Sequence, residues 1–194
     1  LSDISCFSFY PGKDLGAAGE GGAILTNDDA LADKVRLLRD HGSRKKYEHE
    51  IVGHNFRLDT IQAAVLKVKL KHLSSWNQLR RKNAAYYREK LSGLKGLALP
   101  SEMSYAEHVY HLFVVESENR NELQQALSQA KIQTGIHYPI PIHLQKAFLS
   151  LGYKLGDFPV SERAARRVLS LPMFAELTEV QMDRVISVLQ SQLA

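Results

Sequence analysis

Cysteine and long apolar stretches are scarce in this 194-residue chain. Its single cysteine, Cys6, excludes an internal disulfide and a cysteine-rich metal site, and we expect it to be buried among its apolar neighbours. No apolar run approaches the roughly 20 residues that a membrane-spanning helix needs. Internal repeats and low-complexity tracts are also absent. We therefore expect a globular protein of a reducing compartment, the cytoplasm.

Charge of one sign is not in large excess either. The chain has 25 lysines and arginines against 21 aspartates and glutamates, and the two signs alternate along most helical stretches. That pattern favours a solvated surface over a nucleic-acid interface. With 44% hydrophobic and 24% charged residues, the chain is long enough for one substantial core or two small ones.

Strand-like and helix-like patterns alternate along the chain, which predicts an α/β fold. Strands are expected at 4–10, 22–26, 109–116 and 132–138, and helices at 29–39, 58–91, 120–131, 161–169 and 178–189. The longest helical pattern would span ~50 Å as one helix, so we expect it to bridge two domains or to kink near Ser74 and Ser75. The glycines and proline that follow it divide the chain into predicted domains 1–95 and 96–194.

Capping residues mark two of the expected helix starts. Asn27 or Asp28 can cap the helix at 29–39, because both side chains accept hydrogen bonds from free backbone N–H groups. Thr178, followed three residues later by Gln181, forms a capping box before the last helix.

Lys13 follows a predicted strand and a Pro-Gly break and leads into a glycine-rich loop. A lysine in that setting can act as an imine-forming amine, although most such lysines are simply solvated, and the sequence around Lys13 favours that simpler interpretation. The glycines at 19, 21 and 22 suit either a phosphate cradle or a tight turn with positive φ. They lack the spacing of the nucleotide-binding motifs, so we expect the turn.

His137 and His143 flank two prolines in a segment that contains no aspartate or glutamate. Two histidines six residues apart are poorly placed to share a metal ion, so we expect no metal site there. A stiff, proline-rich loop can either aim an imidazole into a cleft or lie on the surface, and the sequence leaves both open.

Asn55 and Arg57 come just before the longest predicted helix, for which Asp59 is a fair cap. A helix start beside an arginine suits an anion site. Plain capping and solvation explain the same residues equally well.

Taken together, many short motifs resemble the DegT/DnrJ/EryC1/StrS family of sugar aminotransferases, which depend on pyridoxal 5'-phosphate (PLP). They occur in family order over essentially the whole chain, at 8–16, 19–23, 40–43, 46–47, 53–59, 62–64, 76–77, 137–139 and 171–174, with Pro141 and His143. Each motif alone is weak, and their shared order carries the resemblance.

The resemblance implies a role for five residues. Lys13 matches the lysine that holds PLP as a Schiff base and later moves a proton, and Ser8 matches the hydroxyl that binds the PLP phosphate. Asn55 matches a phosphate contact from the neighbouring subunit, which implies a homodimer with its active site at the interface. Arg57 and His143 match positions on the substrate side. A lysine at position 13 also indicates transamination over the dehydratase branch, which has histidine there.

The substrate implied by the resemblance is a nucleotide-linked keto-sugar, with glutamate as the amino donor. The form of residues 10–16 is closer to members that act at sugar C3 than at C4. Asp14, where asparagine is more usual, is a small departure from the family pattern.

The resemblance covers only the C-terminal half of the family's fold-type I architecture, the end of the large domain plus a small α/β domain. The chain opens at Leu1 on a predicted strand without an initiator methionine, so we expect further residues to precede it. By itself it is expected to have an incomplete, inactive site. The alternative is a non-catalytic dimerisation or scaffold unit of the same fold. A PLP-domain transcription regulator would need a helix-turn-helix segment, and the sequence offers none.

Overall fold

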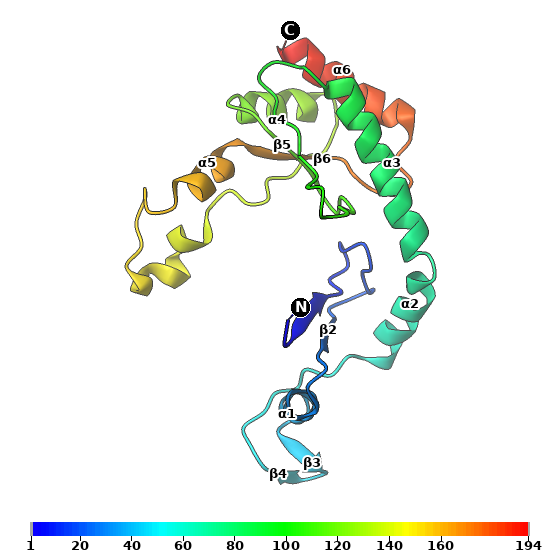
Figure 1. Ribbon diagram of the computed structural model, residues 1–194, viewed down its shortest axis with the longest axis vertical. Coiled ribbons are helices and arrows are strands. Elements are labelled where there is room, and N and C mark those ends of the chain that lie inside the picture. Colours follow the sequence, from blue (N-terminus) through cyan, green and yellow to red (C-terminus); the bar gives the residue numbers. More distant parts are fainter. Residues whose placement is uncertain (1, 194) are drawn as a thin grey trace. The chain divides into compact units, whose positions relative to one another are not determined.

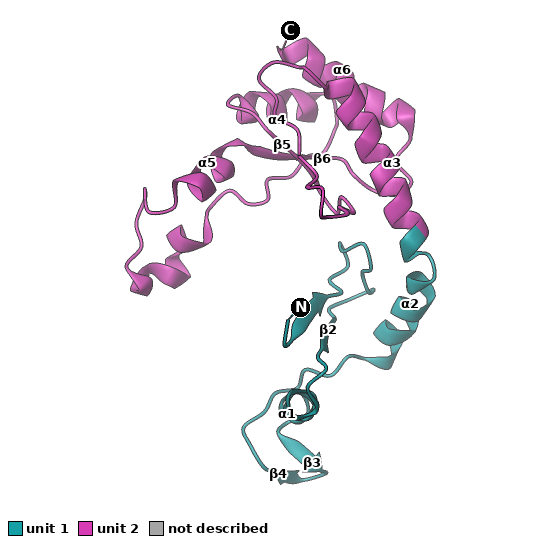
Figure 2. Cartoon of the chain, viewed as in Figure 1, with its two compact units in different colours: residues 1–74 teal, residues 75–194 magenta. Residues whose placement is uncertain are grey.

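The computed structural model describes residues 2–193, and most of its helices and strands are labelled in Figure 1. The chain divides into two compact units, 1–74 and 75–194 (Figure 2). Both strands and helices occur in each unit, so the predicted α/β class is confirmed.

Unit 1 is built from short elements. These are β1 (Ser5–Ser8), β2 (Gly22–Leu25), α1 (Asp29–Arg39), β3 (Ser43–Lys45), β4 (Glu48–His49) and α2 (Thr60–Leu70). β1 and β2 pair antiparallel, with Ser5 opposite Leu25 and Ser8 opposite Gly22. α1 begins where its cap predicts, because the Asp28 side chain accepts hydrogen bonds from the backbone N–H groups of the first turn.

The β1–β2 sheet leaves its apolar side chains uncovered. Phe7 and Ile24 are both exposed, and so is Cys6. The expectation that Cys6 is buried was therefore wrong. A two-stranded sheet buries a face only when another layer packs on it. Among the described residues of unit 1, the buried apolar ones are Ala17, Leu37 and Leu66.

The predicted helix 58–91 is two helices, α2 and α3 (Leu73–Leu91). The interruption lies at Lys71 and His72, slightly before the expected kink, where the backbone makes tighter hydrogen bonds to residues three positions back. α3 packs into the core of unit 2, which is why the compact units separate at 74 and not at 95. The division into domains 1–95 and 96–194 stays a prediction about the whole protein.

Unit 2 contains a two-stranded sheet with helices around it. After α3 come β5 (Phe113–Glu116), α4 (Arg120–Gln129), the 3-10 helices η1 (Ile142–Leu144) and η2 (Lys146–Leu151), α5 (Pro159–Arg167), β6 (Val168–Leu171) and α6 (Glu179–Leu193). β5 and β6 pair antiparallel, with Phe113 opposite Leu171 and Glu116 opposite Val168.

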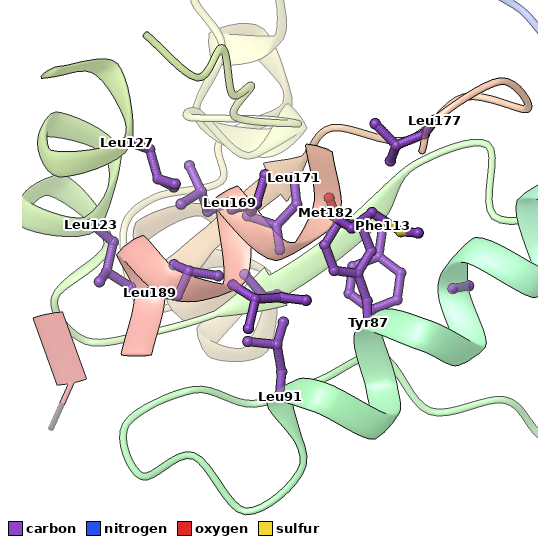
Figure 3. Packing of buried hydrophobic residues seen from close by; sticks show 14 of the residues in the cluster. Tyr87, Leu91, Phe113, Leu123, Leu127, Leu169, Leu171, Leu177, Met182 and Leu189 are labelled. Atoms are coloured by element: carbon purple, nitrogen blue, oxygen red, sulfur yellow. The ribbon is translucent and has the colours of Figure 1, made fainter. Parts of the chain in front are cut away.

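The core of unit 2 lies between this sheet and α3, α4 and α6. Figure 3 shows how side chains from these elements meet, among them Tyr87, Leu91, Phe113, Leu123, Leu127, Leu169, Leu171, Met182 and Leu189. The Tyr87 and Phe113 rings lie 5.1 Å apart between centroids. Burial raises the pKa of Tyr87, whose hydroxyl has no hydrogen-bond partner within residues 2–193.

Two expected elements differ in unit 2. The strand predicted at 132–138 is reduced to a single bridge between Gly135 and Ser170. The end of the helix predicted at 161–169 is strand β6 instead, because four consecutive buried residues pair with β5. The capping box at Thr178 and Gln181 is confirmed by reciprocal hydrogen bonds of 3.0 and 3.3 Å. Among the described residues, no helix has the length and apolar character needed to cross a membrane.

Candidate active site

Lys13 lies in a tight loop that follows β1 in unit 1. Two backbone hydrogen bonds close this loop, from Lys13 N to Tyr10 O at 2.9 Å and from Ala17 N to Phe9 O at 2.8 Å. The Lys13 side chain is exposed, and no hydrogen bond or ion pair holds it to another residue in 2–193. The loop backbone is thus fixed while the amine stays accessible.

Gly16 makes the loop possible, because its backbone lies directly against the preceding turn. A Cβ at this position would be 2.3 Å from Pro11 O and 2.9 Å from Tyr10 O. Lys69, on α2, donates a hydrogen bond from Nζ to the Gly16 carbonyl. Both contacts restrict the conformation of the loop that carries Lys13.

Gly19, Gly21 and Gly22 follow in the chain, and none of them has a positive φ, so the prediction of a turn with positive φ was wrong. Close contacts mark these positions instead. A Cβ on Gly19 would lie 2.9 Å from Gln62 Nε2, and one on Gly22 would lie 2.9 Å from Phe7 O. The same glutamine accepts a hydrogen bond from Ala18 N at 2.9 Å. α2 therefore supports this part of the loop at two points, seven residues apart on the helix.

Ser8 is the last residue of β1 and stands at the entrance of the lysine loop. Its Oγ accepts a hydrogen bond from Tyr10 N at 3.2 Å, and the side chain is exposed. Since a serine hydroxyl both accepts and donates, its hydrogen remains available to an acceptor such as a phosphate oxygen.

Asn55 and Arg57 form a second group in unit 1, next to the end of α1. Asn55 pairs with Asp40 in an isolated bridge, and its Oδ1 accepts a hydrogen bond from Arg57 Nε at 2.9 Å. Arg57 also lies 3.6 Å from the Asp40 carboxylate. The exposed Asn55 amide nitrogen bonds to none of residues 2–193, so it can still donate.

The structure thus brings Ser8 together with the loop of Lys13, and Asn55 together with Arg57. Across the described part of unit 1, no hydrogen bond or ion pair joins the first group to the second.

His143 belongs to unit 2, where it is buried. Its Nε2 lies 3.0 Å from Glu162 Oε1, and its ring packs on Phe158 with centroids 4.7 Å apart. His143 also lines a largely apolar cavity of about 780 Å³. Nothing in the sequence marks Glu162 as the partner of His143, because an acidic residue in the first turn of a helix is an ordinary feature.

His137 and His143, the two histidines considered as metal ligands, have different partners. His137 Nδ1 lies 2.8 Å from Ser170 Oγ, whereas His143 is held by Glu162. In residues 2–193, no group of three or more histidine, cysteine, aspartate or glutamate side chains is placed to hold a metal ion.

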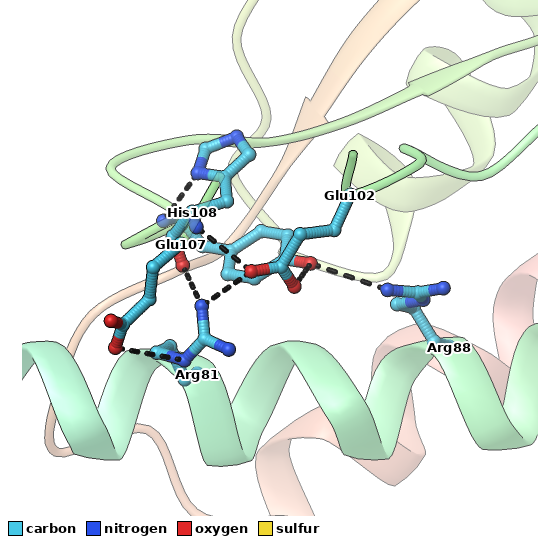
Figure 4. A network of polar contacts seen from close by, with 6 residues as sticks. Arg81, Arg88, Glu102, Glu107 and His108 are labelled. Carbon is cyan, nitrogen blue, oxygen red and sulfur yellow. Dashed lines mark hydrogen bonds and ion pairs between the residues drawn. The ribbon is translucent and has the colours of Figure 1, made fainter. Parts of the chain in front are cut away.

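A further polar cluster, absent from the sequence analysis, ties the loop after α3 to that helix (Figure 4). Arg81 donates to Glu102 Oε1 at 2.6 Å and to His108 O at 2.7 Å. The hydrogen bond from Arg81, followed by that from the His108 N–H, lowers the pKa of Glu102 to about 2. This cluster fixes a loop of unit 2.

The donor set around the lysine loop fits PLP. Lys13 offers an exposed primary amine of the kind that condenses with an aldehyde, and Ser8 offers a hydroxyl that can bind a phosphate ester. The Asn55 amide adds a second donor suited to an anion. This fit rests on residue chemistry and on the closed backbone of the loop.

The model of the DegT/DnrJ/EryC1/StrS aminotransferase family matches residues 1–190, and the chain belongs to this family. Over 190 residues it is 50% identical to the erythromycin biosynthesis sensory transduction protein EryC1 of Saccharopolyspora erythraea, covering 98% of this chain and 52% of that protein. It is 48% identical to a dTDP-3-amino-3,4,6-trideoxy-alpha-D-glucose transaminase of Streptomyces venezuelae. That match covers 95% of this chain and 49% of the transaminase.

A solved structure, NtdA of Bacillus subtilis with the bound cofactor PMP, superposes with a TM-score of 0.90 at 32% identity. The match covers 99% of this chain and 46% of that one. The chain therefore spans about half the length of the relatives it matches, with the partial α/β fold of an aminotransferase of this family.

Proposed function

We propose that this chain is the lysine-bearing, C-terminal half of a PLP-dependent nucleotide-sugar aminotransferase. The observation that carries the proposal is the closed loop that presents an exposed Lys13, in which Tyr10 bonds through its carbonyl to Lys13 N and through its N–H to the Ser8 hydroxyl. Family membership supports it, because the family is one of aminotransferases and a solved relative holds PMP. The proposed location is the cytoplasm.

Each site residue has a proposed task. Lys13 Nζ holds the cofactor, and Ser8 donates its hydroxyl hydrogen to the phosphate. Asn55 donates its amide N–H to the phosphate bound by a second copy of the chain, in a homodimer. In residues 2–74, Asn55 and the lysine loop share no hydrogen bond, which fits that arrangement. Arg57 and His143 serve the substrate side.

PLP supplies the electron sink that allows a proton to leave the carbon bonded to the amino nitrogen. An ammonium group cannot accept a proton, so Lys13 acts as a base only when its Nζ is a free amine. Once the amino donor has released it, Lys13 Nζ moves the proton during transfer of the amino group. The hydrogen bonds from Lys69 and Ala18 around the loop restrict where that amine can reach.

The proposed substrate is a nucleotide-linked keto-sugar that receives its amino group at C3, with glutamate as the donor. The Streptomyces venezuelae relative, a transaminase named for a 3-amino sugar, supports this choice. The second candidate is a non-catalytic dimerisation or scaffold unit. Its support is that the β1–β2 sheet exposes the apolar side chains of Phe7 and Ile24, which suits a surface that packs on another chain.

The test is an absorption spectrum after adding PLP to this chain and, separately, to the full-length gene product. A visible band that is lost in Lys13→Ala and Lys13→Arg but kept in Lys34→Ala, an exposed helix lysine, is the expected result. Glutamate should bleach the band in the full-length protein. If the full-length protein forms no Lys13-dependent band, the aminotransferase proposal fails and the scaffold function takes its place.

A further inference from the structure

A buried carboxylate lies beside His143 and has no part in the proposed function so far. Glu162, in the first turn of α5, has a side chain only 6% exposed, and that of His143 is 9% exposed. Three groups meet at the same carboxylate oxygen, Oε1. They are His143 Nε2 at 3.0 Å, Gly156 N at 2.9 Å and Phe158 N at 3.3 Å.

These contacts determine which atom of the imidazole carries the hydrogen. Backbone N–H groups can only donate, so Oε1 is an acceptor. Burial raises the pKa of Glu162, but the Gly156 N–H, the His143 ring and the Phe158 N–H together outweigh it and lower that pKa. The group is therefore a carboxylate at neutral pH and has no hydrogen to give. The hydrogen between the two side chains must belong to His143 Nε2.

We propose that Glu162 is a positioning residue that holds His143 with a hydrogen on Nε2, so that the ring in its neutral form presents Nδ1 as a hydrogen-bond acceptor. No residue in 2–193 bonds to that Nδ1. The ring lines the cavity of about 780 Å³, whose walls include Ile140 and Phe148. An acceptor in apolar surroundings selects a ligand group that donates O–H or N–H. Taking that group as a hydroxyl of the sugar substrate rests on the proposed function.

Nitrogen NMR of the chain at mildly alkaline pH tests the proposal, with the His143 signals identified by their loss in His143→Gln. The wild-type chain should show a protonated Nε2 and a bare Nδ1. Glu162→Gln should keep this pattern, because its amide oxygen must face the two backbone N–H groups and still accepts from Nε2. Glu162→Ala should give a mixture of tautomers.

Glu122→Gln is the matched control, since Glu122 is an exposed first-turn glutamate of α4. It should leave the His143 signals unchanged. A hydrogen on Nδ1 in the wild-type chain or in Glu162→Gln overturns the proposal, and so does a Glu162→Ala spectrum identical to wild type. If Glu162→Ala does not fold, the wild-type and Glu162→Gln spectra still decide.

Kinetics of the full-length gene product test the link to substrate. Glu162→Ala should raise KM for the sugar at least several-fold without changing the Lys13-dependent absorption band, and Glu162→Gln should restore KM. An unchanged KM in Glu162→Ala overturns the substrate role of the pair. A full-length wild-type protein without transaminase activity refutes the proposed function instead, and the tautomer result is unaffected by it.

Discussion

Replacing Tyr87 with phenylalanine is expected to stabilise unit 2. The Tyr87 side chain is fully buried in α3 against Phe113, and its hydroxyl has no partner among residues 2–193. A buried hydroxyl without a hydrogen bond costs about 1–3 kcal/mol. Removing one oxygen also loses a few contacts worth about 0.1–0.2 kcal/mol each. The net gain in the free energy of unfolding is therefore about 1 kcal/mol.

Urea unfolding of the chain measures this gain. Trp76 is the single tryptophan and lies on α3, so its fluorescence reports on unit 2. With a slope of about 1–3 kcal/mol per molar urea, a gain of ~1 kcal/mol raises the midpoint by roughly 0.3–1 M.

The neighbouring tyrosine provides the control. Tyr86 lies on the same helix, and its hydroxyl donates to Asp183 at 2.6 Å. Tyr86→Phe should therefore lower the midpoint, in the opposite direction to Tyr87→Phe. If both substitutions lower the midpoint equally, the Tyr87 hydroxyl has a partner such as a buried water, and the reasoning is refuted.

Three further predictions follow from single contacts. The pKa of Glu102 is lowered from 4.5 to about 2, so its stabilising effect is present above pH 4.5 and lost as the pH falls toward 2. Glu102→Gln should therefore lower the urea midpoint at pH 7 and make the midpoint fall less steeply as the pH is lowered. A midpoint that depends on pH as in wild type would contradict this. Gly16→Ala puts a Cβ 2.3 Å from Pro11 O and should destabilise the loop by about 1–3 kcal/mol. Hydrogen exchange of the backbone amides in the loop should then be faster. An unchanged exchange rate would show that the loop is looser than described. Lys69→Met removes the hydrogen bond to the Gly16 carbonyl and should weaken PLP binding to the full-length protein, whereas Lys67→Met should not.

Helix caps were predicted correctly from neighbouring residues in the sequence. α1 and the capping box at Thr178 depend on neighbouring residues only, and both occur as expected. The strand at Val168–Leu171 depends on pairing with β5 more than fifty residues earlier. A short apolar run after a helix looks the same whether it extends the helix or begins a strand, so the sequence alone did not separate the two.

The candidate site shows the same limit. Local pattern raised Lys13 and Asn55 only as open candidates, and the resemblance gave them and Ser8 their roles, because an exposed lysine or serine in a loop is common in any sequence. Why Gly22 is a glycine became clear only from the structure, in which a Cβ would lie 2.9 Å from the backbone oxygen of Phe7. Glu162 was missed because its partner, His143, lies nineteen residues away across a loop.

The most direct test of the central proposal is to add PLP to the full-length gene product, reduce with borohydride and locate the modified lysine by peptide mass spectrometry. We expect the cofactor on the peptide that contains Lys13, with no label there after Lys13→Arg and full label in Lys34→Ala. A label on another lysine, or none at all, would contradict the assignment of Lys13 as the residue that holds the cofactor.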